Sequence, residues 1–285
     1  MTADIEIRPI AGALGAELHG VDLARDLDDN TTFAAIHRAL LDHCVIFFRD
    51  QDITPEQQLG FARRFGDIHL HPYIAGMPDY PEIIEILKTE TDTYNFGNDW
   101  HTDQMFAPKP AMATMLYAKE VPAAGGDTIF ANMYKAYDAL SDGMKAMLAG
   151  IKTVAAGDSG KNKAGGRSRR ERYAANGNVA MKEPVDLPAE VEHPLIRTHP
   201  ETGRKSLYIG SHTQRFAGMK DEESDGMIKY LRRHAIRPEF TCRFRWEVGS
   251  LALWDNRCVQ HYAINDYHGK RRRAHRITIR GDTPF

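Results

Sequence analysis

The stretch NDWHTDQMF, residues 98–106, places an imidazole and a carboxylate two positions apart among apolar side chains. In a β-strand successive side chains point to opposite faces, so His101 and Asp103 would share one face. Two such groups can hold one metal ion when a third ligand comes from elsewhere in the chain. A single His-x-Asp pair also arises by chance among 13 histidines, so the prediction depends on whether other segments complete the site.

Residues 251–264, LALWDNRCVQHYAI, supply the candidate third ligand. His261 lies near the end of an apolar strand, just past a turn-like Asp255-Asn256-Arg257. A rolled β-sheet brings distant segments together, and could place His261 beside the earlier pair, about 160 positions away. Two histidines and one carboxylate form the facial triad that leaves three metal positions open and suits non-haem Fe(II).

The composition limits the classes of protein. A 285-residue chain with 42% hydrophobic residues is long enough for one large domain with a real core. Its 37 basic and 39 acidic residues nearly cancel, so the overall charge gives no reason to expect a nucleic-acid or membrane partner. The three cysteines are too few and too far apart for a disulfide framework. Since we find no signal peptide and no apolar run of about 18 residues, we expect a cytoplasmic protein.

Apolar periodicity predicts a few helices among many strands. The expected helices span residues 31–44, 54–65, 131–150 with a break at Ser141, and 220–235. The second begins at TPEQ, residues 54–57, with a capping box and proline at the first helical position. Residues 45–50 are typical of a buried strand, and residues 193–210 of a hairpin that turns at Pro200–Gly203. This order favours one mainly β domain with flanking helices over two α/β domains.

One segment interrupts this pattern. Residues 157–178 are rich in glycine, serine and asparagine, carry six basic residues between Lys161 and Arg172, and show almost no apolar periodicity. We therefore expect a flexible insertion around residues 157–185. It could be a solvated loop or a lid over a binding site, and the sequence leaves both open.

Two arginines near the C-terminus could bind anions. Alternation in KRRRAHRITI, residues 270–279, would put Arg272 and Arg276 on one face of a strand. Arginine pairs bidentately with carboxylates and keeps its charge when partly buried. An exposed basic edge strand would explain the same residues, so this pattern alone leaves both interpretations open.

Six motifs in this order resemble those of a known family. They are WHTD (100–103), GGDT (125–128), HPETGRKSLYIG (199–210), WDNR (254–257), QHYAINDY (260–267) and RRRAHRITIRGD (271–282). The chain is similar to the TauD/TfdA family of Fe(II)- and 2-oxoglutarate-dependent dioxygenases. The similarity runs from GAELHGVDL, residues 15–23, to the C-terminus, so we expect one domain over residues 1–285.

The resemblance implies a double-stranded β-helix, or jelly roll, with helices packed outside. It implies that His101, Asp103 and His261 are the iron ligands. It also implies that Thr128 and Arg272 bind the distal carboxylate of 2-oxoglutarate, and a hydroxyl beside a guanidinium is a sound two-point clamp for that group.

The same resemblance implies the reaction and the class of substrate. With O2 as the second co-substrate, 2-oxoglutarate becomes succinate and CO2 while an unactivated C–H bond is hydroxylated. Arg276 and His71 match residues that hold the substrate's anionic group, so we expect a small carboxylate, sulfonate or sulfate ester. Gly97 replaces a polar residue near the amine of taurine, which argues against taurine itself. Gln104, directly after the carboxylate ligand, either contacts substrate or faces the sheet.

The sequence alone leaves alternatives open for the pocket walls and for the function. Phe96, Met105 and Phe106 could form the walls of a pocket for a hydrophobic or aromatic acid, or could be ordinary core. A zinc hydrolase would use the same three metal ligands but would not need the arginine and threonine clamp. A non-catalytic β-barrel that binds anions would need the arginines alone. From the family we also expect a homo-oligomer, either a dimer or a tetramer.

Overall fold

The computed structural model describes residues 5–26, 29–157, 171, 181–184 and 187–285. Most of the insertion predicted around residues 157–185 lies outside these ranges. No helix in the described ranges is long and apolar enough to cross a membrane.

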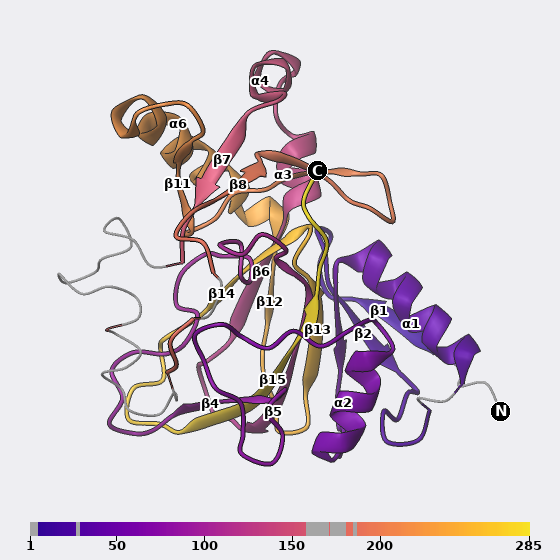
Figure 1. Cartoon of the computed structure of the whole chain (residues 1–285). Coiled ribbons are helices and arrows are strands. Elements are labelled where there is room, and N and C mark those ends of the chain that lie inside the picture. The colour runs from indigo at the N-terminus through magenta and orange to yellow at the C-terminus, as the bar shows by residue number, and fades with distance from the viewer. Residues whose placement is uncertain (1–4, 27–28, 158–170, 172–180, 185–186) are drawn as a thin grey trace.

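A seven-stranded sheet forms the larger β-layer (Figure 1). Its strands, in spatial order, are β1 (Glu6–Pro9), β2 (Ala16–His19), β3 (Val45–Phe48), β13 (Leu251–Asp255), β5 (Ala111–Glu120), β15 (Arg272–Arg280) and β4 (Ile84–Lys88). β2 and β3 run parallel, and the other neighbouring pairs run antiparallel. Strands from both ends of the chain therefore lie side by side in one sheet.

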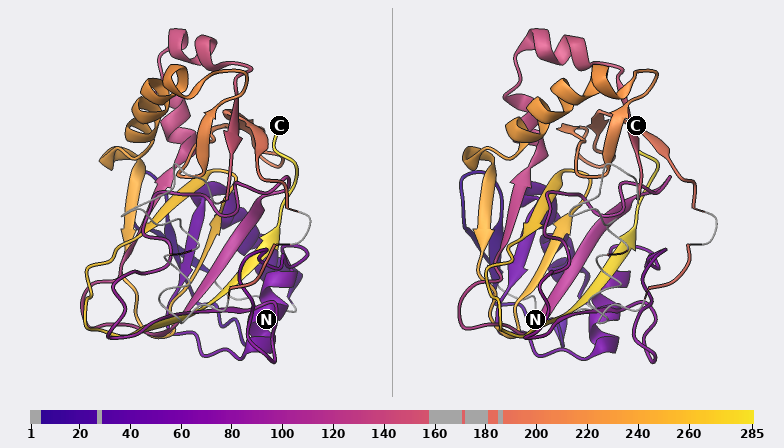
Figure 2. Two further views of the ribbon diagram at one scale, coloured as in Figure 1. Left: turned by 60° about the vertical axis from the view of Figure 1, so that its left-hand side comes forward. Right: turned by 90° about the vertical axis from the view of Figure 1, so that its left-hand side faces the viewer.

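A second sheet packs against the inner face of the first. It consists of β12 (Thr241–Phe244), β6 (Thr128–Asn132) and β14 (Val259–Ala263), in that order. Phe47 of the large sheet stacks on Phe244 of the small sheet with ring centroids 3.9 Å apart. Phe130 of β6 packs against Trp254 of β13 at 5.6 Å. The space between the two sheets is thus filled by one apolar core, and Figure 2 shows the layers from two further directions.

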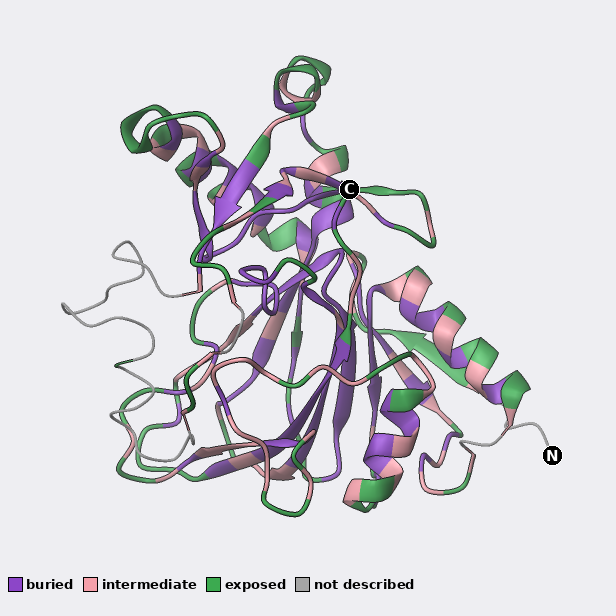
Figure 3. Ribbon diagram, in the orientation of Figure 1, coloured by how far each residue is buried: buried purple, intermediate pink, exposed green. Residues whose placement is uncertain are grey.

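Alternation along the strands decides which side chains face this core. On β3, Val45 and Phe47 point between the sheets, while Ile46 and Phe48 join the other core cluster. That cluster contains residues of α1 (Asn30–His43) and α2 (Pro55–Arg63), which cover the outer face. Figure 3 shows the result as buried strands and as helices with an exposed outer face.

The remaining elements lie beyond one end of the two sheets (Figures 1 and 2). They are α3 (Met133–Asp138), α4 (Asp142–Leu148), α6 (Asp221–Ala235), the 3₁₀ helix Pro238–Phe240, the sheet β11 (Thr213–Phe216), β7 (Lys152–Ala155) and β8 (Val191–Pro194), and the pair β9 (Ile196–Thr198) and β10 (Lys205–Leu207). The break at Ser141 is confirmed, because its hydroxyl caps α4 by accepting from Met144 N. The capping box at Thr54 and the β9–β10 hairpin are confirmed as well. The prediction of a mainly β chain with flanking helices is therefore correct.

Residues 98–106, however, do not form the predicted strand. His101 makes one isolated bridge, and the chain then turns at Asp103 to Phe106. Gln104 has φ of 56°, a left-handed conformation that a strand does not contain. Alternation along a strand is consequently the wrong reason for His101 and Asp103 to point to the same place.

Candidate active site

His101 and His261 are held opposite each other by the backbone. His101 N donates to His261 O at 3.2 Å, and His261 N donates to His101 O at 2.8 Å. Residues paired directly across an antiparallel bridge project their side chains to the same side. The two imidazole centroids are consequently 4.1 Å apart, although 160 positions separate the residues (261 − 101).

Asp103 is turned toward the two imidazoles by a neighbouring asparagine. Asn256, just after β13, accepts a hydrogen bond from Asp103 N at 3.1 Å through Oδ1. Its Nδ2 donates to Thr114 Oγ1 at 2.9 Å, and Thr114 Oγ1 donates to Asp103 Oδ2 at 2.6 Å. Asn256 therefore fixes the backbone of Asp103 directly and its carboxylate through Thr114. The sequence pointed to the WDNR motif but not to this role.

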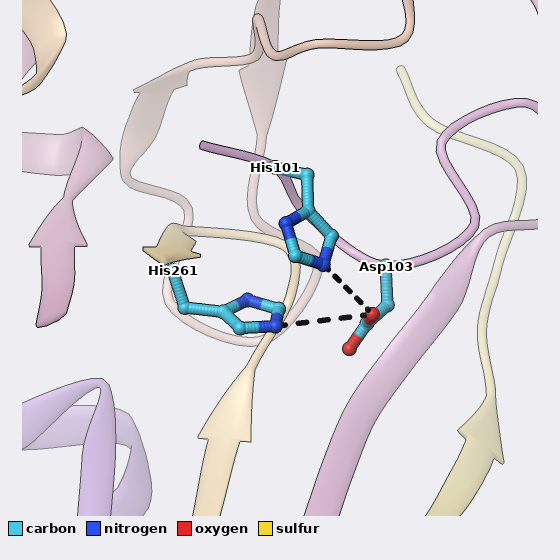
Figure 4. A group of neighbouring side chains, drawn as sticks. All are labelled: His101, Asp103 and His261. Atoms are coloured by element: carbon cyan, nitrogen blue, oxygen red, sulfur yellow. Dashed lines mark ion pairs between the residues drawn. The ribbon is translucent and has the colours of Figure 1, made fainter. Parts of the chain in front are cut away.

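The three predicted metal ligands converge (Figure 4). Asp103 Oδ1 lies 3.6 Å from His101 Nε2 and 4.0 Å from His261 Nε2. One ligand atom from each residue lies within 4.8 Å of the others, and all three residues are buried. Two imidazole nitrogens and one carboxylate oxygen are the donor set of non-haem Fe(II) sites, so the residues fit such an ion.

Local contacts favour the metal-binding forms of these groups. The ring of His101 places Nδ1 2.6 Å from Asp99 O, so a proton on Nδ1 leaves Nε2 as the acceptor facing Asp103. Burial, followed by the nearby His101, lowers the pKa of His261 well below its usual value, which favours neutral imidazole. Burial alone would raise the pKa of Asp103, but Arg276, the two histidines and the hydrogen bond from Thr114 together outweigh burial and hold that pKa below its usual range.

A cavity extends from this cluster between the two sheets and contains both Thr128 and Arg272. Gly126, with φ of 74°, lets the chain turn close to Arg272: a Cβ there would lie 3.4 Å from Arg272 Cδ. Trp246 Nε1 donates to Thr128 Oγ1 at 3.0 Å and so orients its hydroxyl. Within the described residues, Arg272 Nε is buried without a hydrogen-bond partner, and burial lowers the pKa of this arginine. A buried guanidinium with an unused donor is suited to an anion.

Arg276 lies in the same cavity, four positions along β15. Its Nη2 is 2.8 Å from Asp103 Oδ1, and its Nη1 is buried with no hydrogen-bond partner in the part of the chain that the structure describes. Phe96 forms part of the cavity wall, with its ring 5.7 Å from Arg276 Cζ. The exposed-edge interpretation of these two arginines is therefore wrong, because β15 is paired on both sides and both side chains are buried.

The other predicted site residues lie around this cavity rather than in its lining. His71 packs near Phe106, with ring centroids 6.4 Å apart, and its pKa is lowered by burial and then by Arg276. Gln104 is buried, and neither polar atom of its side chain has a hydrogen-bond partner among the residues that the structure describes. Met105 belongs to a core cluster with Ala155 and Tyr208, so the core interpretation is correct for it.

The site is buried and combines two histidines and one carboxylate with a cavity that contains two arginines. This combination defines a class of oxygen-dependent metalloenzymes. The family model "Taurine catabolism dioxygenase TauD, TfdA family" matches residues 6–278, and the chain belongs to this family. It is a 2-oxoglutarate-dependent dioxygenase, with 2-oxoglutarate and O2 as co-substrates.

Characterised relatives are similar over almost the whole chain. An alpha-ketoglutarate-dependent sulfate ester dioxygenase of Pseudomonas putida is 34% identical, covering 99% of this chain and 91% of that protein. An alkylsulfatase of Acinetobacter baylyi is 34% identical, with 99% and 86% covered. An (S)-phenoxypropionate/alpha-ketoglutarate-dioxygenase of Sphingobium herbicidovorans is 34% identical, with 92% and 90% covered.

Solved structures show the same fold. A taurine dioxygenase from Burkholderia xenovorans superposes with a TM-score of 0.80 at 35% identity, covering 98% of this chain and 90% of that one. AAD-2, solved in complex with Mn(II) and N-oxalylglycine, gives a TM-score of 0.76 at 30% identity, with 98% of each chain covered. The predicted jelly roll is thereby confirmed.

Proposed function

We propose that the protein binds Fe(II) through His101, Asp103 and His261 and hydroxylates a small organic anion. The main support is that ligand atoms of these three residues lie within 4.8 Å of one another, in a cavity that also contains two buried arginines. The bound iron would supply activation of O2 and of the keto acid. A zinc hydrolase or an anion-binding barrel would account for only part of this arrangement.

Thr128 and Arg272 would hold 2-oxoglutarate. The unused Nε donor of Arg272 and the oriented hydroxyl of Thr128 lie in one cavity with the metal ligands. Together they can bind the distal carboxylate, which leaves the keto-acid end free to face the metal ligands. The similarity to AAD-2, solved with Mn(II) and N-oxalylglycine, supports this assignment.

Arg276 and His71 would recognise the anionic group of the prime substrate. Arg276 Nη1 has no hydrogen-bond partner among the described residues, and Phe96 beside it offers an apolar surface. We favour an alkyl or aryl substrate that carries a sulfate ester or a carboxylate, as the names of two relatives suggest. One oxygen atom of O2 would enter the product and the other succinate. With an alkyl sulfate, hydroxylation of the carbon bearing the ester oxygen gives a product whose C–O bond breaks to an aldehyde and hydrogen sulfate.

Taurine fits this site poorly. Gly97 offers no side chain to its amine, and with φ of 83° the position favours glycine. A Cβ at Gly97 would lie 3.3 Å from His101 Cε1, so a larger residue would press on a metal ligand.

The test is a panel of hexyl sulfate, 2-phenoxypropionate and taurine, each assayed for substrate-dependent succinate formation with Fe(II), 2-oxoglutarate and O2. We expect turnover with at least one of the first two and at most weak turnover with taurine. If none of a broader set of sulfate esters and carboxylates stimulates succinate formation by an enzyme that binds both iron and 2-oxoglutarate, the proposed substrate class is wrong.

The chain would work as a single domain in the cytoplasm, which three free and buried cysteines support. We also propose a homo-oligomer, either a dimer or a tetramer. Gln104 would help to shape the substrate pocket.

A further inference from the structure

A second cavity, of about 500 Å³, lies next to the active centre. His71 lines it, although the cavity containing the metal ligands has a different lining. Its walls come from segments far apart in sequence: the loop after α2, the turn that follows Asp103, the end of β15 and residues near 182. A volume in the range of ligand pockets, built by convergent segments, is a feature of binding sites.

The cavity carries an excess of positive charge. Lys109, Lys182 and Arg280 line it, and none of the three forms an ion pair within the part of the chain that the structure describes. Glu183 is the one acidic residue among the described lining residues. Three cations around one pocket repel each other unless solvent or an anion offsets them.

The electrostatic environment of a lining histidine agrees with this. Burial and then Arg280, Arg276 and Lys182 lower the pKa of His69. Arg280 and Lys182 thus act on a histidine that lines the same cavity, and an anion bound there would oppose this effect.

Apolar side chains complete the lining. Leu70, Pro72, Pro108 and Leu187 contribute to the walls between the basic groups. Leu70 is 52% exposed, which is high for a leucine and leaves its side chain available to a ligand. A ligand that satisfies the whole pocket therefore needs both an anionic group and an apolar body.

We propose that this cavity is a second anion-binding site, in which Lys109, Lys182 and Arg280 hold an organic anion with an apolar body outside the iron site. Its function is to capture the anionic substrate before the substrate passes His71 toward Arg276. The capture role rests on the proposed function, whereas the binding itself does not. Removal of the cations should therefore raise KM for the substrate and leave kcat unchanged.

The test measures binding of hexyl sulfate to the metal-free full-length protein by calorimetry, while NMR follows the imidazole signals of His69 and His71. We expect wild-type protein to bind hexyl sulfate with shifts of both histidines, and Lys109→Gln/Arg280→Gln to bind it about tenfold more weakly or worse, since charged groups in a partly desolvated pocket dominate anion affinity. Lys229→Gln/Arg233→Gln is the matched control. It removes two exposed basic residues of α6 and the same net charge, and should bind like wild type.

Two further measurements separate this site from the active centre. Arg276→Gln should retain the binding and the His69 shift, because Arg276 lies outside this cavity. Absence of binding to wild type, or binding lost in Arg276→Gln but intact in Lys109→Gln/Arg280→Gln, would overturn the second site. Equal affinities for inorganic sulfate and hexyl sulfate would show that the apolar walls do not contribute to binding. A failure of every anion to stimulate succinate formation would count against the proposed function and would leave the binding result standing.

Discussion

At the scale of single residues, the site depends on how Asp103 is held. Its carboxylate contacts Arg276 through one oxygen and Thr114 through the other, while its backbone NH donates to Asn256. These three contacts orient the one anionic ligand before any metal arrives. Groups that orient metal ligands are often nearly as important for affinity as the ligands themselves.

Asn256→Ala should weaken metal binding without removing a ligand. We expect affinity for Fe(II), or for Mn(II) as a redox-stable substitute, to fall by about 10- to 100-fold, because Asp103 and Thr114 lose their common partner. The free energy of unfolding should fall by about 2 kcal/mol. Calorimetry and urea unfolding measure these effects.

The control is Asn30→Ala, since Asn30 is an exposed residue that accepts a hydrogen bond from Arg64. Unchanged metal affinity in Asn256→Ala would show that the asparagine is only structural.

Arg272→Lys should separate binding of 2-oxoglutarate from binding of metal. Lysine keeps the charge but loses the planar fork that matches a carboxylate, so KM for 2-oxoglutarate should rise about tenfold or more. Metal affinity should stay the same. Arg273→Lys is the matched control on the same strand, because that residue pairs with Glu85 and Glu120 instead of facing the cavity. Equal effects of the two substitutions would contradict the clamp.

The sequence predicts some of these residues but not all. Chemical type and spacing pointed to His101, Asp103 and His261, because few residue types bind metal. Thr114 gave no such signal, since a threonine in a buried strand is common. Thr114 points between the sheets because it lies two and four positions from Leu116 and Ala118 on β5, whose side chains belong to that core. This direction follows from the position of β5 in the sheet and not from the residue type.

At the scale of elements, the segment before His101 fits closely against the metal site. Ala263 N donates to Gly97 O at 3.0 Å, which ties this segment to the end of β14. Gly97 adopts φ of 83° here, so the chain passes His101 without a side chain between them.

Gly97→Ala should therefore damage the site as well as the fold. The left-handed backbone costs alanine about 1–2 kcal/mol, and the new Cβ would lie 3.3 Å from the ring of His101. Gly269→Ala is the matched control, since it has φ of 69° with no atom within 4 Å of an added Cβ. Both variants should lose stability in urea, but only Gly97→Ala should lose metal affinity. Similar metal affinities in the two variants would show that the close contact has no role.

Short-range sequence patterns correctly predicted where two helices begin. The capping box at Thr54 and the cap at Ser141 are short-range patterns, and both helix starts are where they indicate. The prediction of a strand over residues 98–106 is wrong because apolar content does not indicate the left-handed turn at Gln104. That turn is stabilised by Asn256, a partner more than 150 positions away.

At the scale of the whole molecule, buried histidines tie stability to pH. The pKa of His193 is lowered by burial, and the pKa of His71 is lowered by burial and Arg276. Both lie below the unfolded value of about 6.5, so the unfolded chain binds more protons as the pH falls. The contribution of these histidines to stability is present above pH 6.5 or so and is lost below it.

The free energy of unfolding of the metal-free protein should consequently decrease between pH 7 and pH 5. Each such histidine contributes up to about 1.4 kcal/mol per pH unit. Urea unfolding at several pH values measures the slope, and His193→Gln should reduce it. A flat profile from pH 7 to pH 5 would contradict the burial of these histidines as neutral groups.

The fold as a whole was predictable in class but not in topology from residue patterns alone. Strand-like segments on both sides of the helices indicated one mainly β domain, and the family motifs implied the jelly roll. The neighbours of β5, namely β13 and β15, come from the last third of the chain. No local pattern encodes that pairing, because it is set by packing between the sheets.

The central claim is that His101, Asp103 and His261 bind Fe(II) beside a 2-oxoglutarate clamp. The most direct test is an anaerobic titration of metal-free protein with Fe(II) and then 2-oxoglutarate, followed by visible spectroscopy. We predict the weak charge-transfer band of an iron-chelated keto acid in the wild type and its loss in His101→Ala. A folded wild-type protein that shows no band at saturating Fe(II) and 2-oxoglutarate would contradict the assignment of this site.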